Sequence, residues 1–223
     1  MIPELSISSI VSASACPLRL YYEQREERTE TPRYTIAKQI SYHLGKTPDP
    51  TEVWDEVCHV QGDCDHSLRE FFDESFRVCR NNPEWRIPRD TDVFVQSSTH
   101  HIHGVIDKLF DEEPVFSIVR SGKAPKVGVY PSDRIRIACY TACLQEMLGI
   151  AVTGGSLEYI PSGISRFYRV APIDKRRFLR ALHEARRIRN GELPRRPLRP
   201  PCEHCPQNSR CIPGGGTRLS DIL

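Results

Sequence analysis

The sequence has no apolar run of roughly 18 residues, the length that a helix needs to cross a bilayer. Its first ten residues, MIPELSISSI, lack the basic start and the apolar stretch of a signal peptide. Internal repeats and long low-complexity segments are also lacking, which argues against repeat and disordered architectures. With 223 residues, 39% of them hydrophobic and 27% charged, the chain is predicted to be a soluble, cytoplasmic, single-domain protein without a membrane partner.

Cysteine, by contrast, is plentiful. Nine cysteines in a protein of the reducing cytoplasm favour metal binding over disulfides. Cys202, Cys205 and Cys211 follow a C-x2-C-x5-C spacing in PCEHCPQNSRC, and Cys16 stands far upstream in SACPLRLYY. Three thiolates from one loop leave a four-sulfur site one ligand short, so Cys16 is the candidate fourth ligand. The spacing alone leaves both a zinc site and an iron-sulfur cluster open.

The formal net charge of +2 hides an uneven distribution of charge along the chain. Residues 49–90 contain eleven acidic side chains and five arginines, whereas residues 175–199 contain ten lysines and arginines and two glutamates. A polyanion would be attracted to the second segment and repelled by the first. The plain alternative is a basic helix that only faces solvent.

The hydrophobic pattern changes after Pro88 from helical spacing to short runs rich in β-branched and aromatic residues. Before that point we expect helices at 6–28, 35–46 and 51–79, the last as one helix or as two broken near Gly62. After it we expect five strands at 91–96, 101–110, 115–119, 155–160 and 165–171.

Two further helices are expected, one from an N-cap at Ser132 to Gly149 and one from Asp174 to Asn190. This order predicts an α/β fold with a mixed central sheet flanked by helices. The chain divides into an N-terminal helical part, a sheet-containing core and a proline-rich strap with the cysteine loop, at 1–88, 89–192 and 193–223.

The segments CPLRLYY, GVIDKLF, SGKAP, SDRIRIACY and CEHCPQNSRC together resemble the RecB-like iron-sulfur nucleases of PD-(D/E)xK type. That family includes the CRISPR-associated adaptation exonuclease and the nuclease domains of AddB-type helicase-nucleases, and the resemblance covers nearly the whole chain. It implies a restriction-endonuclease-like core, a 4Fe-4S cluster, and metal-dependent hydrolysis of DNA. The implied cluster ligands are Cys16, Cys202, Cys205 and Cys211.

The resemblance places catalytic roles on His43, Asp107, Arg120 and Tyr140, with His43 and Asp107 as ligands of Mg²⁺ or Mn²⁺. The catalytic pattern nevertheless departs from the family at three positions. The family's acid-x-Lys-Ser/Thr-Gly run reads here from Ile118 to Gly122, so Ile118 replaces the second acid and Arg120 replaces the lysine. Arg136 stands where the family has glutamine. Isoleucine offers a metal no oxygen, and arginine does not release its proton but grips phosphate well.

These departures predict a DNA-binding protein with catalysis lost or strongly reduced. The resemblance implies that it acts on single-stranded ends or forked DNA, in CRISPR adaptation or DNA repair. An active exonuclease is the first alternative, with an acid of the turn Asp111, Glu112 and Glu113 in place of the missing one. The second is a scaffold that docks on a nuclease or a CRISPR integrase. The residues expected to contact DNA are Arg120, Lys123, Arg136, Lys175, Arg176 and Arg186.

Overall fold

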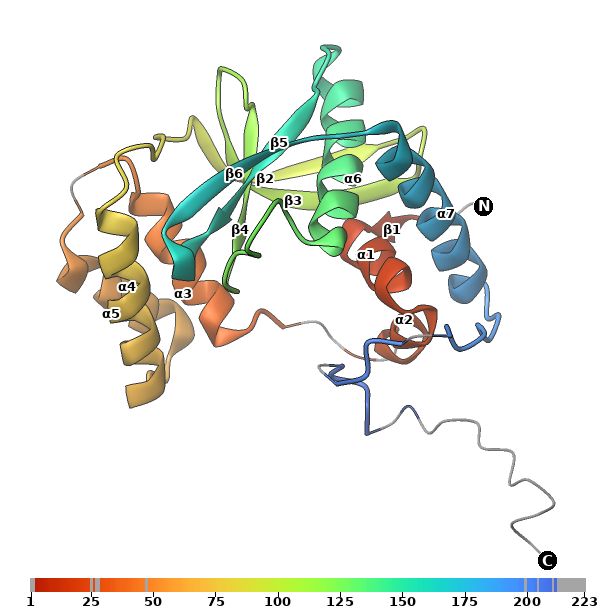
Figure 1. Ribbon diagram of the computed structural model, residues 1–223, viewed down its shortest axis with the longest axis horizontal. Helices are drawn as coiled ribbons and strands as arrows, with labels where there is room; N and C mark the ends of the chain where they lie inside the picture. The colour runs from red at the N-terminus through yellow and green to blue at the C-terminus, as the bar shows by residue number, and fades with distance from the viewer. Residues whose placement is uncertain are drawn as a thin grey trace, which may run out of the picture.

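A six-stranded mixed sheet forms the centre of the computed structural model, and helices cover it on both sides (Figure 1). The structure describes residues 3–24, 26, 29–46, 48–198, 200–203, 205–209 and 211. The strands are β1 (Leu5–Ser6), β2 (Asp90–Ser97), β3 (Ile102–Leu109), β4 (Phe116–Arg120), β5 (Gly154–Tyr159) and β6 (Ile164–Arg169). The α-helices are α1 (Ile7–Ala15), α2 (Pro17–Glu23), α3 (Pro32–His43), α4 (Pro50–Gln61), α5 (His66–Arg80), α6 (Pro131–Leu148) and α7 (Pro172–Arg189), and η1 (Ile160–Ser162) is a 3₁₀ turn.

The sheet follows the order β1-β3-β4-β5-β6, and β2 pairs with the remaining edge of β3. The pairs β1/β3 and β4/β5 are parallel, and the other three pairs are antiparallel. Helix α6 makes the crossover between the parallel strands β4 and β5. The expected α/β order and the five expected strands are confirmed, whereas the two-residue strand β1 was not predicted.

The expected helix over 6–28 is wrong, because the chain breaks at Cys16 into α1 and α2. Cys16 has an extended backbone (φ −159°, ψ 117°) and caps both helices. Pro17 explains the break, since a proline disfavours the helical conformation in the residue before it and fits the first position of a new helix. Cys16 is thereby held at a corner of the chain.

The other helix boundaries follow from turn residues. Gly62, at φ 80°, separates α4 from α5. Of the two alternatives expected for residues 51–79, the structure therefore has two helices broken near Gly62. Gly149, at φ 65°, ends α6 as predicted. The predicted N-cap at Ser132 is wrong, because Tyr130 is the N-cap and Pro131 takes the first helical position.

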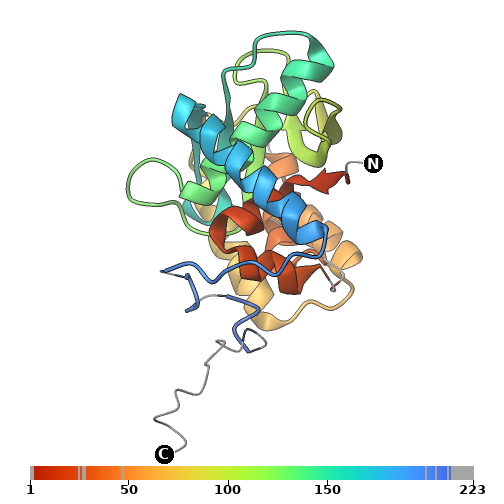
Figure 2. The same cartoon turned by 90° about the vertical axis from the view of Figure 1, so that its right-hand side faces the viewer.

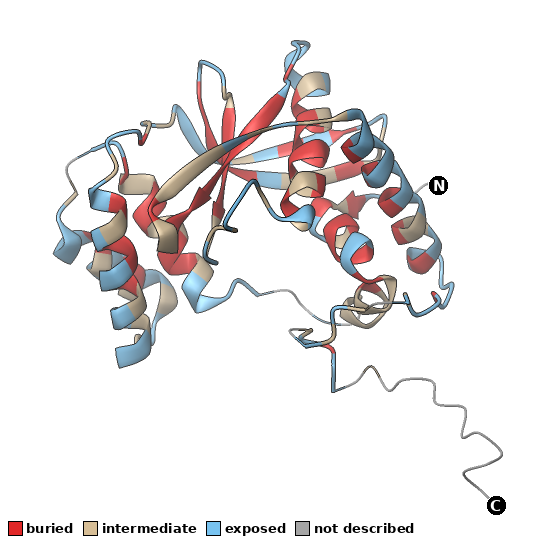
Figure 3. Ribbon diagram, in the orientation of Figure 1, coloured by how far each residue is buried: buried red, intermediate tan, exposed pale blue. Residues whose placement is uncertain are grey.

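Two apolar clusters hold the helices against the sheet. One lies among the sheet, α1, α6 and α7 and includes Ile10, Ile106 and Ile118. The other joins α3, α4 and α5 to Val119 and to η1. Ile118 and Val119 are neighbours on β4 yet belong to different clusters, because successive side chains point to opposite faces of a strand. Figure 3 shows the buried residues concentrated on the strands and on the helix sides that face them.

Helix α7 lies across α1 and α6 (Figure 2). It buries Phe178, Leu182, Ala185 and Ile188, the residues that the helical spacing had assigned to its inner side. Its basic residues are mostly exposed on the other side. No helix among the described residues combines the length and the apolar character needed to cross a membrane.

Candidate functional site

Asp107, on β3, is buried with only 2% of its surface exposed. The Tyr34 hydroxyl donates to Asp107 Oδ1 at 2.6 Å, and the Val119 N–H donates to Oδ2 at 2.8 Å. Burial raises the pKa of Asp107 to about 6, and these two hydrogen bonds and nearby Lys38 oppose the shift. Both carboxylate oxygens are thus already accepting hydrogen bonds from the protein.

Asp92 lies beside Asp107 in an irregular stretch of β2. The β2/β3 pairs on either side are in register, which places Asp92 opposite Asp107, but the Asp92 backbone has φ 53°. A positive φ in a residue other than glycine is strained, and such residues cluster at functional sites. Lys38 Nζ lies 2.6 Å from Asp92 Oδ1, and the charge of Asp92 contributes to the raised pKa of Asp107.

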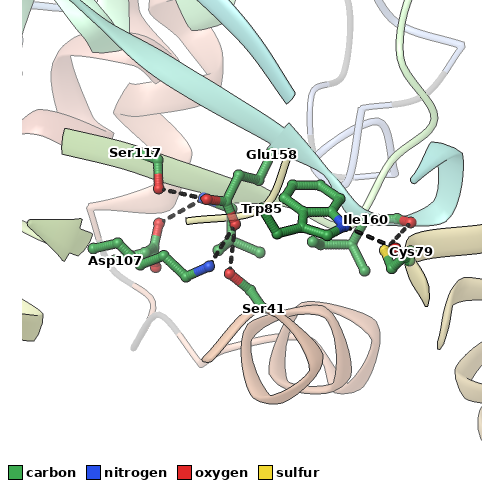
Figure 4. Close-up of polar contacts among 9 residues, drawn as sticks. Ser41, Cys79, Trp85, Asp107, Ser117, Glu158 and Ile160 are labelled. Atoms are coloured by element: carbon green, nitrogen blue, oxygen red, sulfur yellow. Dashed lines mark hydrogen bonds and ion pairs between the residues drawn. The ribbon is translucent and has the colours of Figure 1, made fainter. Parts of the chain in front are cut away.

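A buried ion pair stands next to Asp107 in the sequence and close to it in space (Figure 4). Lys108 Nζ, on a side chain with no exposed surface, lies 3.0 Å from Glu158 Oε2. The hydroxyls of Ser41 and Ser117 donate to the two Glu158 oxygens at 2.6 and 2.8 Å. This network connects α3 with β3, β4 and β5 next to Asp107.

These neighbours of Asp107 were not predicted from the sequence. A signal was present for two of them, since Lys108 in VIDKLF and Glu158 in SLEYI are charged residues inside apolar strands. Charges in such places are paired, and a search for the partner would have linked them. No comparable signal marks Tyr34 or Asp92.

His43 and Asp107 are not brought together by any contact among the described residues. His43 Nε2 lies 2.7 Å from Glu56 Oε2, so α3 places this histidine against α4. The Tyr140 hydroxyl donates to the Val105 carbonyl at 2.6 Å, which pins α6 to β3. Burial raises the pKa of Tyr140 to about 12.

The turn after β3 does not bring a replacement acid to Asp107. Asp111 pairs with Arg89 at 3.1 Å, and Glu113 accepts a hydrogen bond from the Thr153 hydroxyl at 2.7 Å. Glu112 is exposed at the same turn. These acids face solvent and other elements.

The residues around Asp107 offer a divalent metal few of the oxygen ligands that it needs. A hard cation such as Mg²⁺ takes several oxygen ligands. Ile118 lies in the apolar core with 3% exposure, and the oxygens of Asp107 are engaged by Tyr34 and Val119. Within the described part of the chain, no group of three or more His, Cys, Asp or Glu side chains is placed to hold a metal ion.

A cavity of about 750 Å³, called here the arginine cavity, opens beside the ends of β4 and α2. Arg19, Arg120 and Arg136 all line it. Arg120 Nε forms an ion pair with Asp133 Oδ1 at 3.1 Å, although its angles are not those of a hydrogen bond, and the Tyr159 hydroxyl donates to Asp133 Oδ2 at 2.9 Å. The other lining residues are Ser8, Val11, Ser12, Ala15, Glu23, Glu26, Thr29, Ser132, Pro201, Cys205, Pro206 and Gln207.

The structure brings Cys16 to the C-terminal cysteine loop. Cys16, Cys202, Cys205 and Cys211 line one small cavity, called here the cysteine cavity, and an Arg196 nitrogen lies 3.6 Å from the Cys202 Sγ. Burial raises the pKa of Cys211, and the other three thiols add to the shift while Arg196 opposes it. Four soft donors from the two ends of the chain therefore line one cavity, although no three of these described residues are placed in this structure to hold a metal ion.

The cysteine cavity and the arginine cavity share a wall. Arg19, Cys205 and Gln207 line both. Gln207 is buried, and its Nε2 donates to Glu26 Oε2 at 2.6 Å. The position of the cysteine loop consequently shapes one side of the arginine cavity.

The remaining residues expected to contact DNA are spread over the molecule. Lys123 is in the loop between β4 and α6, and Lys175 and Arg176 are exposed on α7. Arg186 instead points inward, where its Nη2 donates to the His100 carbonyl at 2.9 Å. Only Arg120 and Arg136 of the six predicted contacts line the arginine cavity.

No protein-family model matches the chain, and no curated protein sequence matches it. Among solved structures, the chain is similar to a protein from Eubacterium rectale whose crystal structure carries the name "Putative exonuclease". The TM-score is 0.59, the sequence identity is 12%, and the match covers 99% of this chain and 92% of that chain. Since identity this low shows the fold alone, the mixed sheet, its flanking helices and this similarity show a nuclease-like fold.

Proposed function

We propose that this protein binds DNA on a nuclease-like fold and has lost, or strongly reduced, the ability to cut it. The observation that carries the proposal is the arginine cavity. Arg120 and Arg136 stand where the family of similar sequence motifs has lysine and glutamine, and both line this one cavity. Guanidinium groups bind phosphate through several hydrogen bonds, so their gathering favours holding DNA.

The surroundings of Asp107 support the loss of cutting. Ile118 supplies no oxygen, and His43 contacts Glu56. Both carboxylate oxygens of Asp107 accept hydrogen bonds, one from Tyr34 and one from Val119. The motif resemblance places such a DNA-binding protein at single-stranded ends or forks, in CRISPR adaptation or DNA repair in the cytoplasm.

Salt dependence of DNA binding tests the proposal. Protein that neutralises phosphates releases counterions, so affinity for a labelled single strand should fall steeply as salt rises. Arg120→Ala and Arg136→Ala should each weaken binding and flatten this dependence. Arg77→Ala, at an exposed site on α5 outside the cavity, is the control of equal charge change. An affinity that does not change with salt contradicts the proposal. An equal loss of affinity in all three variants also contradicts it.

Residual cleavage is a second candidate function, favoured by the position of Asp92 opposite Asp107. Asp92 is the carboxylate that could act with Asp107 where Ile118 cannot. Labelled single strands should be incubated with the protein and Mn²⁺, alongside Asp107→Ala and Asp92→Ala. Cleavage that both variants abolish would favour an exonuclease over a binding protein.

We also propose that Cys16, Cys202, Cys205 and Cys211 hold a 4Fe-4S cluster. The motif resemblance and the shared cavity of the four thiols support this, and thiolates are the usual ligands of such clusters. When bound, the cluster supplies a crosslink between the two ends of the chain.

Iron and sulfide, measured per chain in protein purified without oxygen, test the cluster. Cys205→Ser should lower both values. Cys58→Ser, on α4 and outside the cysteine cavity, should leave them unchanged. Zinc without iron in the native protein would contradict the cluster and favour a zinc site.

A further inference from the structure

The arginine cavity contains donors that the protein leaves incompletely paired. Arg120 is anchored by its Nε to Asp133, and no described residue hydrogen-bonds to its two terminal nitrogens. The Arg136 Nε is buried and has no hydrogen-bond partner in the described part of the chain. That nitrogen has almost no accessible surface, so the donors open to an acceptor from outside the chain are those with which Arg120 and Arg136 line the cavity.

The two acids that line the cavity, Glu23 and Glu26, have other hydrogen-bond donors as partners. Glu23 accepts hydrogen bonds from Ser12 and Arg19, and Glu26 accepts one from Gln207. Both carboxylates therefore accept hydrogen bonds from donors near α2 and the cysteine loop. The other two arginines, Arg120 from β4 and Arg136 from α6, line the same cavity.

The start of α6 adds a further positive potential. Ser132, in the first turn of this 18-residue helix, lines the cavity. Pro131 has no N–H, and the Asp133 N–H donates to the Tyr130 carbonyl at 3.0 Å, so α6 contributes chiefly the partial positive charge that its dipole places at this end. Asp133, in the same turn, forms an ion pair with Arg120 and accepts a hydrogen bond from Tyr159. The ion pair orients the Arg120 side chain.

We propose that the arginine cavity binds the terminal phosphate of a DNA strand, an inference that rests on the DNA-binding function proposed above. A terminal phosphomonoester carries about −1.5 to −2 charges and three exposed oxygens, whereas a phosphate within the strand carries a single charge. Two guanidinium forks and a helix N-terminus match the greater charge and the larger number of acceptors. The cavity therefore favours the end of a strand over its interior.

The experiment compares oligonucleotides of one sequence that end in a 5′-phosphate, in a 3′-phosphate, or in hydroxyls at both ends. Fluorescence anisotropy at about 150 mM salt gives the three affinities for the native protein. We expect one phosphorylated end to bind about tenfold more tightly than the hydroxyl-ended strand. Arg120→Lys and Arg136→Lys keep the charge but lose the fork, so each should reduce this preference to about twofold or less. Arg77→Lys should retain it.

Inorganic phosphate provides a measurement that needs no variant. It should displace the phosphorylated strand more effectively than chloride of the same ionic strength, and this advantage over chloride should be smaller for the hydroxyl-ended strand. Equal affinities for all three strands, with normal salt dependence, overturn the terminal-phosphate site while DNA binding stands. A preference that survives in both lysine variants also overturns it. Failure to bind any strand overturns the DNA-binding function itself.

Discussion

Because Lys108 and Glu158 form a buried ion pair, we expect Glu158→Gln to destabilise the protein strongly. Glu158 accepts hydrogen bonds from Lys108, Ser41 and Ser117. Glutamine has nearly the same shape, but it carries no charge and its amide nitrogen cannot accept a hydrogen bond. The variant leaves the Lys108 ammonium, whose side chain is 0% exposed, without a counter-charge.

The magnitude follows from this burial. Removing one partner of a buried ion pair costs about 3–5 kcal/mol of unfolding free energy. For a chain of this size each kcal/mol lowers the melting temperature by about 2–4 °C, so the expected loss is about 6–20 °C. Asp73→Asn breaks an exposed pair with Arg69, and the melting temperature should stay within about 3 °C of the native value.

Thermal unfolding followed by circular dichroism measures these shifts, and urea unfolding gives the free energies. The double variant Lys108→Met/Glu158→Leu removes both charges and should recover part of the loss, because the uncompensated ammonium is gone. A Glu158→Gln protein that melts within about 3 °C of the native protein would refute the reasoning, since Lys108 would then not depend on Glu158.

Two further predictions concern β3. Burial holds the pKa of Asp107 near 6, above its unfolded value, so the stability from the protonated carboxyl is present below about pH 4 and lost as pH rises through 6. Asp107→Asn should gain about 3 kcal/mol relative to the native protein between about pH 4 and pH 7 in urea unfolding, and a constant difference across this range would contradict the assigned burial. Gly104→Ala would place a Cβ 2.9 Å from the Tyr140 ring, which should cost about 1–3 kcal/mol, whereas Gly122→Ala meets nothing within 4 Å and serves as the control. Equal urea midpoints for the two glycine variants would show that the Tyr140 ring can move aside.

Most of the elements could be predicted because their signals are local. Hydrophobic periodicity and turn residues such as Gly62 and Gly149 depend on neighbours within a few positions. The helix predicted across Cys16 is wrong, because Pro17 disfavours a helical backbone in the residue before it. Strand β1 could not be predicted, because two residues show no period and their pairing with β3 is decided at a distance.

The sequence by itself determined the α/β order, the four cysteines of unusual spacing, and the departures at Ile118, Arg120 and Arg136. The tertiary structure alone decided which of these residues meet. It paired Asp107 with Tyr34 and Lys108 with Glu158, separated His43 from Asp107, and gathered the two arginines in one cavity beside the cysteine loop. Local preferences act over one or two turns of chain, whereas these contacts join residues more than ten positions apart and arise only when the helices pack on the sheet.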